Sequence, residues 1–274
     1  MPPILSPEEI LSFRKEIYRY YKKNRRSLPW RDTYNPYYIL VSEVMLQQTQ
    51  VERVNEKYRE FIAAFPDFSA LARAGLNAVL RVWSGLGYNR RAIALIKLAK
   101  TIVADYGGNL PQDVEALASL PGIGKATAGS LAAFAFNQPS VFAETNIRRV
   151  FIHFFFRDSE NIHDREVLRL VEETLDRKNP REWYYALMDY GAMLKKAVLN
   201  PNRRSAHYKK QPPFEVSDRK IRGAVIRTLL KRGSLQSKEI AGAIEADPDR
   251  VDRILVRMRD EGLVREDSGG YYIP

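Results

Sequence analysis

The chain has 274 residues, a formal net charge of +11 and no cysteine. Without cysteine, a disulfide framework, a cysteine nucleophile and metal sites built on thiolates are excluded. A hydrophobic fraction of 45% allows one large core or two smaller ones, and the excess of Lys and Arg favours a polyanionic partner, nucleic acid before an anionic membrane surface. The sequence shows neither a signal peptide nor an apolar run that could cross a bilayer, so we expect an intracellular, cytoplasmic protein without a membrane partner.

Helical periodicity dominates the first 200 residues. The segment Ser6–Glu9 has the pattern of a helix start, with a Ser N-cap, Pro at the first helical position and Glu at the third. Glycine and proline turns separate the later helical runs, and nothing before residue 215 alternates like a strand. We therefore predict an all-α fold for this part. The further helices are expected at 37–50, 51–64, 68–73, 75–82, 89–105, 113–119, 124–136, 144–156, 164–176 and 180–198.

The last quarter of the chain has a different pattern. Residues 200–217 contain three prolines and no apolar periodicity, which predicts a linker. Residues 218–274 show three helices followed by two short strands, the order of a winged helix–turn–helix module. An arginine stripe on its third helix, at 250, 253 and 257, suits either DNA contact or a solvated edge of a protein-contact module. The two interpretations stay open, because this tail has twelve basic and ten acidic residues.

Residues 120–129, with the sequence LPGIGKATAG, join two short helices through a Gly-x-Gly turn. Glycine permits close approach of the backbone, and the N–H groups at the start of the second helix can bind a phosphate. Lys125 adds positive charge at the same place. This pattern is typical of a helix–hairpin–helix motif, which binds the DNA backbone without reading the base sequence.

Two carboxyl groups lie in opposite sequence contexts. Glu43 lies inside an apolar helical run, where burial would raise its pKa and suit it to general-acid catalysis. Glu144 lies at a helix start, where the dipole and free N–H groups stabilise an anion. An acid paired with an anion is what glycosyl transfer through an oxocarbenium-like transition state requires. Each Glu taken alone is better explained as a structural residue, so the hypothesis depends on the two together.

Six segments, in this order and spacing, resemble the helix–hairpin–helix DNA glycosylases and, among them, the MutY-type adenine glycosylases. The resemblance covers residues 8–200. It implies a two-lobed helical core over 1–199, with a six-helix barrel lobe at about 29–140 and a second lobe formed by the N-terminal helix plus 141–199. The linker at 200–217 and the small α+β winged-helix module at 218–274 follow this core. The segments are LPWR, SEVMLQQTQV, WSGLGYNRRA, LPGIGKATAG, ETNIRRV and LMDYGAM.

The resemblance also implies roles for individual residues. Glu43 corresponds to the general acid that protonates the departing adenine, and Glu144 to the carboxylate, usually Asp, that stabilises the sugar cation. Arg31 corresponds to a residue near the base pocket, and Asn146 to one that supports the second carboxylate. Intercalation and contact with the orphaned base fall to Leu46, Gln47, Gln48 and Tyr88. Backbone contact falls to Gly122, Gly124, Lys125 and Thr127. The positive charge of the stretch at 195–210 suits either further contact with the DNA backbone, which we favour, or a solvated linker. Its basic residues are Lys195, Lys196, Arg203, Arg204, Lys209 and Lys210.

Three departures from the family pattern matter. The four cysteines that hold a [4Fe–4S] cluster in the family are missing, so we expect no cofactor and no metal; the scattered histidines give no metal site either. Bifunctional relatives have a nucleophilic Lys where this chain has Ala126, which disfavours Schiff-base lyase chemistry. The short tail replaces the Nudix-like half that helps to recognise 8-oxoguanine, so selectivity for that base is unsupported.

The leading hypothesis is a monofunctional DNA glycosylase of base excision repair that acts as a monomer on double-stranded DNA at the nucleoid. Its expected substrate is adenine opposite guanine or 8-oxoguanine. One alternative keeps the chemistry but changes the base to thymine or uracil opposite guanine, or to a deaminated or alkylated purine. The other alternative is a DNA-binding protein without catalysis, and the Glu at position 144 keeps that alternative open.

Overall fold

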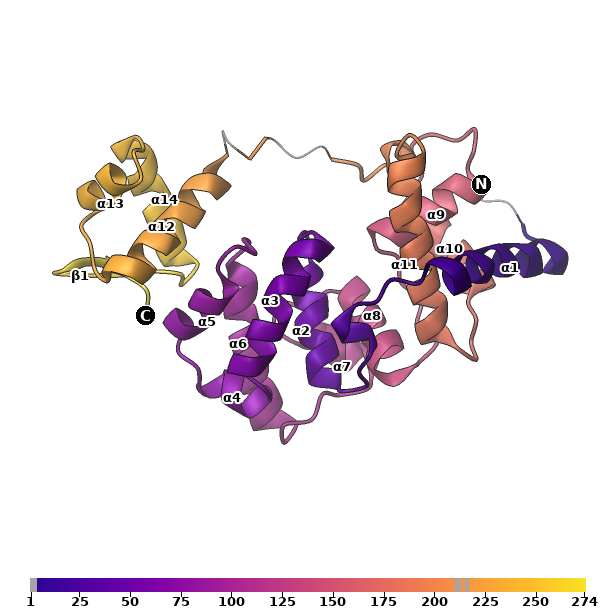
Figure 1. Cartoon of the computed structure of the whole chain (residues 1–274), viewed down its shortest axis with the longest axis horizontal. Coiled ribbons are helices and arrows are strands. Elements are labelled where there is room, and N and C mark those ends of the chain that lie inside the picture. Colours follow the sequence, from indigo (N-terminus) through magenta and orange to yellow (C-terminus); the bar gives the residue numbers. More distant parts are fainter. Residues whose placement is uncertain (1–3, 210–212, 215–216) are drawn as a thin grey trace. The chain divides into compact units, whose positions relative to one another are not determined.

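The computed structural model describes residues 4–209, 213–214 and 217–274. The chain divides into two compact units, each built from discontinuous segments. The first unit comprises residues 1–40, 112–119 and 123–210, and the second comprises 41–111, 120–122 and 211–274. Figure 1 follows the helices from the indigo N-terminus to the yellow C-terminus.

All named elements of the first unit are helices, over its described residues. Its longest helices carry the apolar side chains that form its core, and the connections between them are short. Its elements are α1 (Pro7–Asn24), the 3-10 helix η1 (Pro29–Arg31), α7 (Val114–Ser119), α8 (Lys125–Phe136), α9 (Thr145–Phe155), α10 (Asp164–Thr174), α11 (Pro180–Ala197) and the 3-10 helix η2 (Pro201–Arg204). Helix α2 (Pro36–Leu46) begins in this unit and ends in the second.

The second unit combines a helical layer with the winged module. Its elements are α3 (Val51–Ala64), α4 (Phe68–Arg73), α5 (Leu76–Trp83), α6 (Arg90–Asp105), α12 (Asp218–Arg232), α13 (Ser237–Ala243), α14 (Pro248–Asp260), β1 (Arg265–Asp267) and β2 (Gly270–Tyr272).

Aromatic packing forms the centre of the first unit, where α1, α9 and α11 lie against one another. Phe13 of α1 is the common partner: its ring centroid lies 5.5 Å from that of Phe151, 4.9 Å from that of Phe155 and 5.7 Å from that of Trp183. Edge-on aromatic contacts of this kind stabilise a core beyond the area that they bury. At the start of α1, Ser6 and Glu9 form the expected capping box.

The tail has the predicted order of three helices and a hairpin. Strands β1 and β2 pair antiparallel, with Arg265 opposite Tyr272. The inward faces of α12, α13 and α14 are apolar and buried, which explains the 3.6-residue period in their sequences. In the arginine stripe, Arg250 and Arg257 both pair with Asp218, at 2.8 and 3.6 Å, so part of the charge of the stripe is neutralised.

The predicted fold class is confirmed: the chain is mostly helical, with a small two-stranded antiparallel sheet near its C-terminus. Most helix boundaries lie within two residues of the expected ones, and one differs more. The helix expected at 37–50 ends at Leu46, because Gln48 takes a positive φ of 56° that an α-helix does not tolerate.

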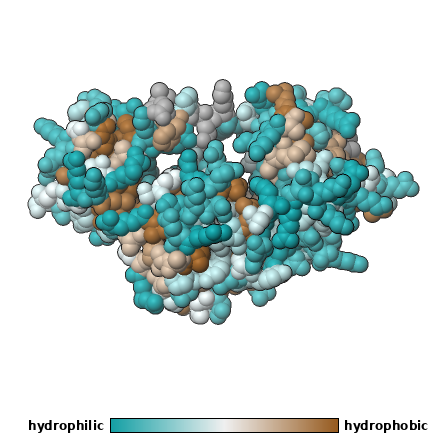
Figure 2. Space-filling model, in the orientation of Figure 1, coloured by the Kyte–Doolittle hydropathy of each residue, from teal (hydrophilic) through white to brown (hydrophobic). Residues whose placement is uncertain are grey.

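The surface agrees with this arrangement of amphipathic helices. On the face shown in Figure 2, hydrophilic side chains cover most of the surface and apolar ones form small separate patches. In the part of the chain that the structure describes, no helix is both long enough and apolar enough to cross a membrane.

Candidate active site

Glu144 is the N-cap of α9. Its Oε1 accepts hydrogen bonds from the backbone N–H groups of Asn146, at 2.7 Å, and Ile147, at 3.0 Å. The side-chain amide of Asn146 donates to the other carboxylate oxygen, Oε2, at 3.3 Å. The local sequence explains this geometry, because an acidic residue before a helix can satisfy N–H groups that have no partner within the helix. The carboxylate is therefore held in one orientation.

Arg149 forms a second layer behind this carboxylate. Its guanidinium NH1 donates to Asn146 Oδ1 at 2.6 Å and to the carbonyl of Gly191 at 2.7 Å, and its Nε donates to Asn200 Oδ1 at 3.1 Å. Glycine at position 191 lets α11 pack closely against Asn146, because a Cβ atom there would lie 2.4 Å from the carbonyl oxygen of Asn146. Sequence analysis missed Arg149, although its place in the segment ETNIRRV, one turn after Asn146, was a usable signal.

Burial has the largest effect on the protonation of Glu144. It raises the pKa of Glu144 above its ordinary value, although hydrogen bonds from Ile147 and Asn146 and the positive charge of Arg149 act in the opposite direction. The expected hydrogen bonds of a helix N-terminus are present, yet they do not lower the pKa on balance. The anion of Glu144 is therefore less favoured than its position in the sequence indicated.

Arg31 lies in a buried ion pair. Its NH1 and NH2 donate to the two carboxylate oxygens of Asp189, both at 2.9 Å, and Arg26 binds the same carboxylate. The Arg31 guanidinium carbon also lies 4.5 Å from the ring centroid of Tyr185. Burial raises the pKa of Asp189, but the hydrogen bonds and charges of Arg31 and Arg26 outweigh it, so the pKa is lowered. Arg31 thus has a fixed place against α11.

A cavity of about 450 Å³ lies beside this ion pair within the first unit. Arg31 forms part of its wall, and most of the other side chains that line it are polar or aromatic. They include Tyr21, Arg25, Tyr34, Asn137, Arg181 and Tyr185.

Glu43 lies in the part of α2 that belongs to the second unit, whereas Glu144 belongs to the first. Its side chain is half-buried, and its neighbours Ser42 and Val44 are buried. The predicted general acid therefore lies in an apolar stretch of helix and keeps partial access to solvent.

The expected intercalating residues follow directly after Glu43 and again at Tyr88. Leu46 ends α2, and Gln48 and Tyr88 both have positive φ angles, of 56° and 48°. The buried side chain of Arg91 lies between the two segments and donates to the carbonyl oxygens of Gln47, at 2.7 Å, and Gly87, at 3.1 Å. The structure thus brings together two groups of residues that are about forty positions apart in the sequence.

The hairpin turn between α7 and α8 is exposed. Gly122 has a φ of 80°, which favours glycine, and Gly124 is the N-cap of α8 without a side-chain hydrogen bond. Gly122, Gly124 and Lys125 are exposed and Thr127 is half-buried. A helix N-terminus with an exposed glycine turn and an adjacent Lys is suited to bind a phosphate.

The basic stretch at 195–210 has two kinds of residue. Lys195, Lys196, Arg203 and Lys209 are exposed. Arg204 is instead bound to the first unit: its guanidinium donates to carbonyl oxygens at the C-terminal end of α9, including that of Ile152 at 3.2 Å. Lys210 lies outside the described residues.

This same segment is where the family resemblance places a [4Fe–4S] cluster. The residues do not fit such a group, because the chain has no thiolate donor, and the described residues contain no group of three or more His, Asp or Glu that could hold a metal. The segment predicted as part of a linker instead contains η2, whose Asn202 donates to the carbonyl of Thr145 at 2.9 Å. Backbone hydrogen bonds between Ile162 and both Arg204 and Ala206, each 2.9 Å, also fix it.

Comparison with known proteins identifies the family of the chain. Residues 41–177 match the model of the HhH-GPD superfamily base excision DNA repair protein. The adenine DNA glycosylase of Mycolicibacterium smegmatis is 32% identical over an alignment of 286 positions, which covers 98% of this chain and 95% of that protein. The adenine DNA glycosylase of Buchnera aphidicola subsp. Baizongia pistaciae is 38% identical over 179 residues, 64% of this chain, and the match spans only 50% of that protein.

Solved structures give the same fold. A thermostable thymine-DNA glycosylase is similar with a TM-score of 0.61 and 26% sequence identity, covering 68% of this chain and 87% of that chain. A trapped endonuclease III–DNA covalent intermediate is similar with a TM-score of 0.59 and covers 77% of this chain and 92% of that chain. At 20% identity the second comparison supports the fold alone.

Proposed function

Because the chain belongs to the HhH-GPD superfamily of base excision DNA repair proteins, we propose that it is a monofunctional DNA glycosylase that removes mispaired adenine from double-stranded DNA. The observation that carries this proposal is the fixed carboxylate of Glu144, held by Asn146 and backed by Arg149, in a chain similar along almost its whole length to an adenine DNA glycosylase.

The two carboxyl groups divide the chemistry. The target base is first turned out of the duplex, because its glycosidic bond is not accessible in the stack. As the bond between C1′ of the sugar and N9 of adenine breaks, its electron pair stays on the base and Glu43 supplies the proton that makes the base a better leaving group. The anion of Glu144 stabilises the cationic sugar until water adds at C1′ and loses a proton.

The structure of Glu144 suits that role. Two backbone N–H groups occupy Oε1, while Oε2 receives only the longer contact from Asn146. The additional methylene of Glu, compared with the Asp usual in the family, changes where that oxygen lies, and a shift of about 1 Å can change a rate by roughly 10²-fold. Position 144 is therefore a sensitive determinant of rate.

The reaction stops at the abasic site. Ala126 provides no amine for a Schiff base with the sugar, so strand cleavage through a lysine adduct is not available at that position. Contact with DNA comes from the exposed hairpin turn and from Lys195, Lys196 and Arg203. We expect the protein to act as a monomer inside the cell, at the nucleoid, and to bind the DNA backbone without reading the base sequence.

Base release from a panel of duplexes tests the proposal. The panel pairs adenine with guanine and with 8-oxoguanine, pairs thymine and uracil with guanine, and includes hypoxanthine and an alkylated purine. We expect release of adenine without strand cleavage, abolished by Glu43→Gln and strongly slowed by Glu144→Gln, while both variants bind DNA near normally. Tight binding with no release of any base would reject the enzyme and leave the non-catalytic DNA-binding protein.

A second substrate has one observation in its favour. The structural similarity to a thymine-DNA glycosylase, at 26% identity, makes thymine opposite guanine the main competitor. Release of thymine but not adenine from the same panel would show that thymine is the substrate of the same glycosidic-bond hydrolysis.

A further inference from the structure

One buried side chain, Arg91 in the first turn of α6, joins the two segments expected to enter the DNA helix. We propose that Arg91 is a positioning residue that makes residues 46–48 and Tyr88 a single rigid wedge for turning out the target base. This inference rests on the proposed function and assigns the device that supplies its first step.

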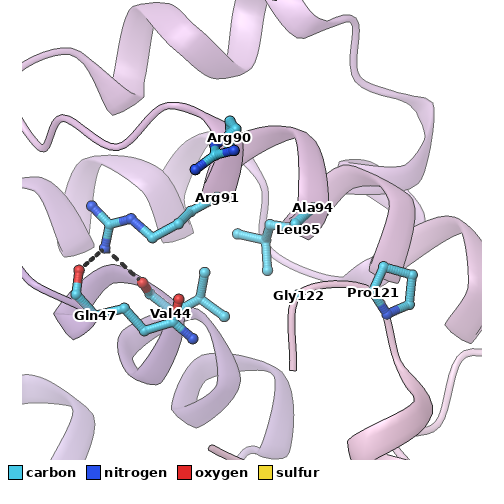
Figure 3. A pocket seen from close by; sticks show the side chains of 8 residues that line it. All are labelled: Val44, Gln47, Arg90, Arg91, Ala94, Leu95, Pro121 and Gly122. Atoms are coloured by element: carbon cyan, nitrogen blue, oxygen red, sulfur yellow. Dashed lines mark hydrogen bonds between the residues drawn. The ribbon is translucent and has the colours of Figure 1, made fainter. Parts of the chain in front are cut away.

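The first half of the contact is with the end of α2. Arg91 NH1 donates to the carbonyl oxygens of Val44 at 2.8 Å, Met45 at 2.7 Å and Gln47 at 2.7 Å, and its NH2 donates to Thr49 Oγ1 at 2.9 Å. Figure 3 shows the guanidinium pointing at the carbonyls of Val44 and Gln47. The last carbonyls of a helix have no partner within it, so one guanidinium replaces the bonds that the next turn would have made.

The second half of the contact is with the loop before α6. Arg91 NH2 donates to the carbonyl of Gly87 at 3.1 Å, and Nε lies 3.4 Å from the carbonyl of Tyr88. The guanidinium carbon also lies 5.3 Å from the ring centroid of Trp83 and 5.4 Å from that of Tyr88. The planar fork of Arg can hold both segments at once because its donors point in several fixed directions.

Two strained residues flank these acceptors. Gln48 and Tyr88, neither of them glycine, both have positive φ angles. A side chain is costly in this region, and such residues persist where the surroundings over-determine them. The hydrogen bonds of Arg91 to both neighbouring segments supply that constraint.

The positive charge of Arg91 is buried among neutral hydrogen-bond acceptors. The side chain is buried, and its hydrogen bonds go to backbone carbonyls and a hydroxyl. Burial lowers the pKa of Arg91 to about 10, which still leaves it protonated at neutral pH. A positive charge at the end of α2 also complements the helix dipole.

The wedge residues lie beside a small cavity within the second unit. A cavity of about 180 Å³ is lined by Val44, Gln47 and Arg91 on one side and by Pro121 and Gly122 on the other. Gly122 touches α6 so closely that a Cβ atom there would lie 2.7 Å from the Cβ of Ala94. Helix α6 thus supports both Arg91 and the Pro121–Gly122 turn.

Base extrusion is measured with a duplex that carries 2-aminopurine opposite guanine, whose fluorescence rises when the base leaves the stack. The measurement uses the Glu43→Gln background, so that no base is released. Arg91→Met and Arg91→Lys are compared with Arg14→Met, because Arg14 also donates to backbone carbonyls, those of Thr174 and Leu175, but in the first unit. Arg91→Lys keeps the charge and loses the fork, so it separates positioning from electrostatic attraction.

We expect both Arg91 variants to reduce the rate of the fluorescence rise by about 10²-fold, with DNA affinity of Arg91→Lys within about threefold of the parent and Arg14→Met unaffected. In the free protein, hydrogen exchange at 44–49 and at 86–90 should accelerate together in Arg91→Met. An unchanged rise together with unchanged exchange would overturn the inference.

A failure of the proposed function looks different. If the wild-type protein binds the duplex but releases no adenine, and the Glu43→Gln protein unstacks no 2-aminopurine, the glycosylase proposal is rejected. If hydrogen exchange at 44–49 and at 86–90 still accelerates together in Arg91→Met, Arg91 joins the two segments even without the glycosylase function. If exchange in these segments is the same in Arg91→Met and Arg14→Met, the inference about Arg91 is overturned.

Discussion

Arg31 and Asp189 form a two-pronged ion pair in the first unit, with both N–O distances at 2.9 Å and side-chain exposures of only 2% and 1%. The pair connects η1 with α11, two elements that are distant in the sequence. A buried charge that loses its partner is strongly destabilising, whereas the intact pair contributes little net stability. Loss of either partner of this pair should therefore destabilise the fold.

Asp189→Asn should lower the free energy of unfolding by about 3–5 kcal/mol, because it leaves the Arg31 guanidinium buried without a counter-charge. Asp32→Asn is the control: Asp32 pairs with Arg25 at 3.4 Å on the surface, where such pairs contribute about 0–1 kcal/mol. Denaturant titration measures both. The pKa of Asp189 is lowered in the fold, so its stabilisation should be present above the unfolded-state pKa and disappear as the pH falls through the folded one. Equal losses in the two variants would contradict this account.

The acid limb of the pH dependence of single-turnover base release should follow Glu144, whereas Glu43, the proton donor, acts in its protonated form. Because burial raises its pKa and the anion is the active form, the rate should rise with pH, with its acid limb above the ordinary range of a Glu. Arg149→Met removes a charge that lowers this pKa, so the limb should move to higher pH. An acid limb that stays in place in Arg149→Met would show that Arg149 does not act on Glu144 electrostatically.

Gly191→Ala should slow base release more than it weakens DNA binding. The new Cβ would lie 2.4 Å from the carbonyl oxygen of Asn146 and would push the support of Glu144 aside. Overpacking of this kind costs about 1–3 kcal/mol in stability. Gly242→Ala in α13 meets nothing within 4 Å and should instead stabilise the protein by about 0.4–1 kcal/mol. Normal activity of Gly191→Ala would mean that α9 can shift without cost.

Lys125→Gln should weaken binding to every duplex alike. Loss of one phosphate contact should reduce the slope of log affinity against log salt by about 1. Lys57→Gln, which removes a Lys that pairs with Glu60 at 2.7 Å, should leave the slope unchanged. Fluorescence anisotropy at several salt concentrations provides both slopes, and identical slopes for the parent and Lys125→Gln would place the hairpin away from the phosphates.

Treatment with an iron chelator should change neither the midpoint of thermal unfolding nor the rate of base release. The stretch at 195–210, where the family resemblance places a cluster, is held by hydrogen bonds such as that from Asn202 to the carbonyl of Thr145. Asn202→Ala removes the amide that donates this hydrogen bond and should cost about 0.5–1.5 kcal/mol. Loss of activity on chelation, restored by iron, would refute this view of the segment.

Sequence patterns predicted those features that depend on neighbours along the chain. The Ser6 cap, the place of Glu144 at a helix start and the Gly-x-Gly turn at Gly122 are all confirmed, because each depends on a few consecutive residues. The residue patterns also indicated the family, since the motifs have the order and spacing of the family within one continuous stretch of 8–200. The roles of the individual site residues stay predictions until the experiments above are done.

What only the tertiary structure decided involves residues far apart in sequence. Arg31 and Asp189 are separated by 158 positions, and Arg91 reaches a carbonyl 47 positions away. No local pattern indicates such contacts, because packing brings the partners together. The same reason applies to Glu144: its hydrogen bonds were local and foreseeable, but the burial that raises its pKa comes from atoms that only the folded chain places around it.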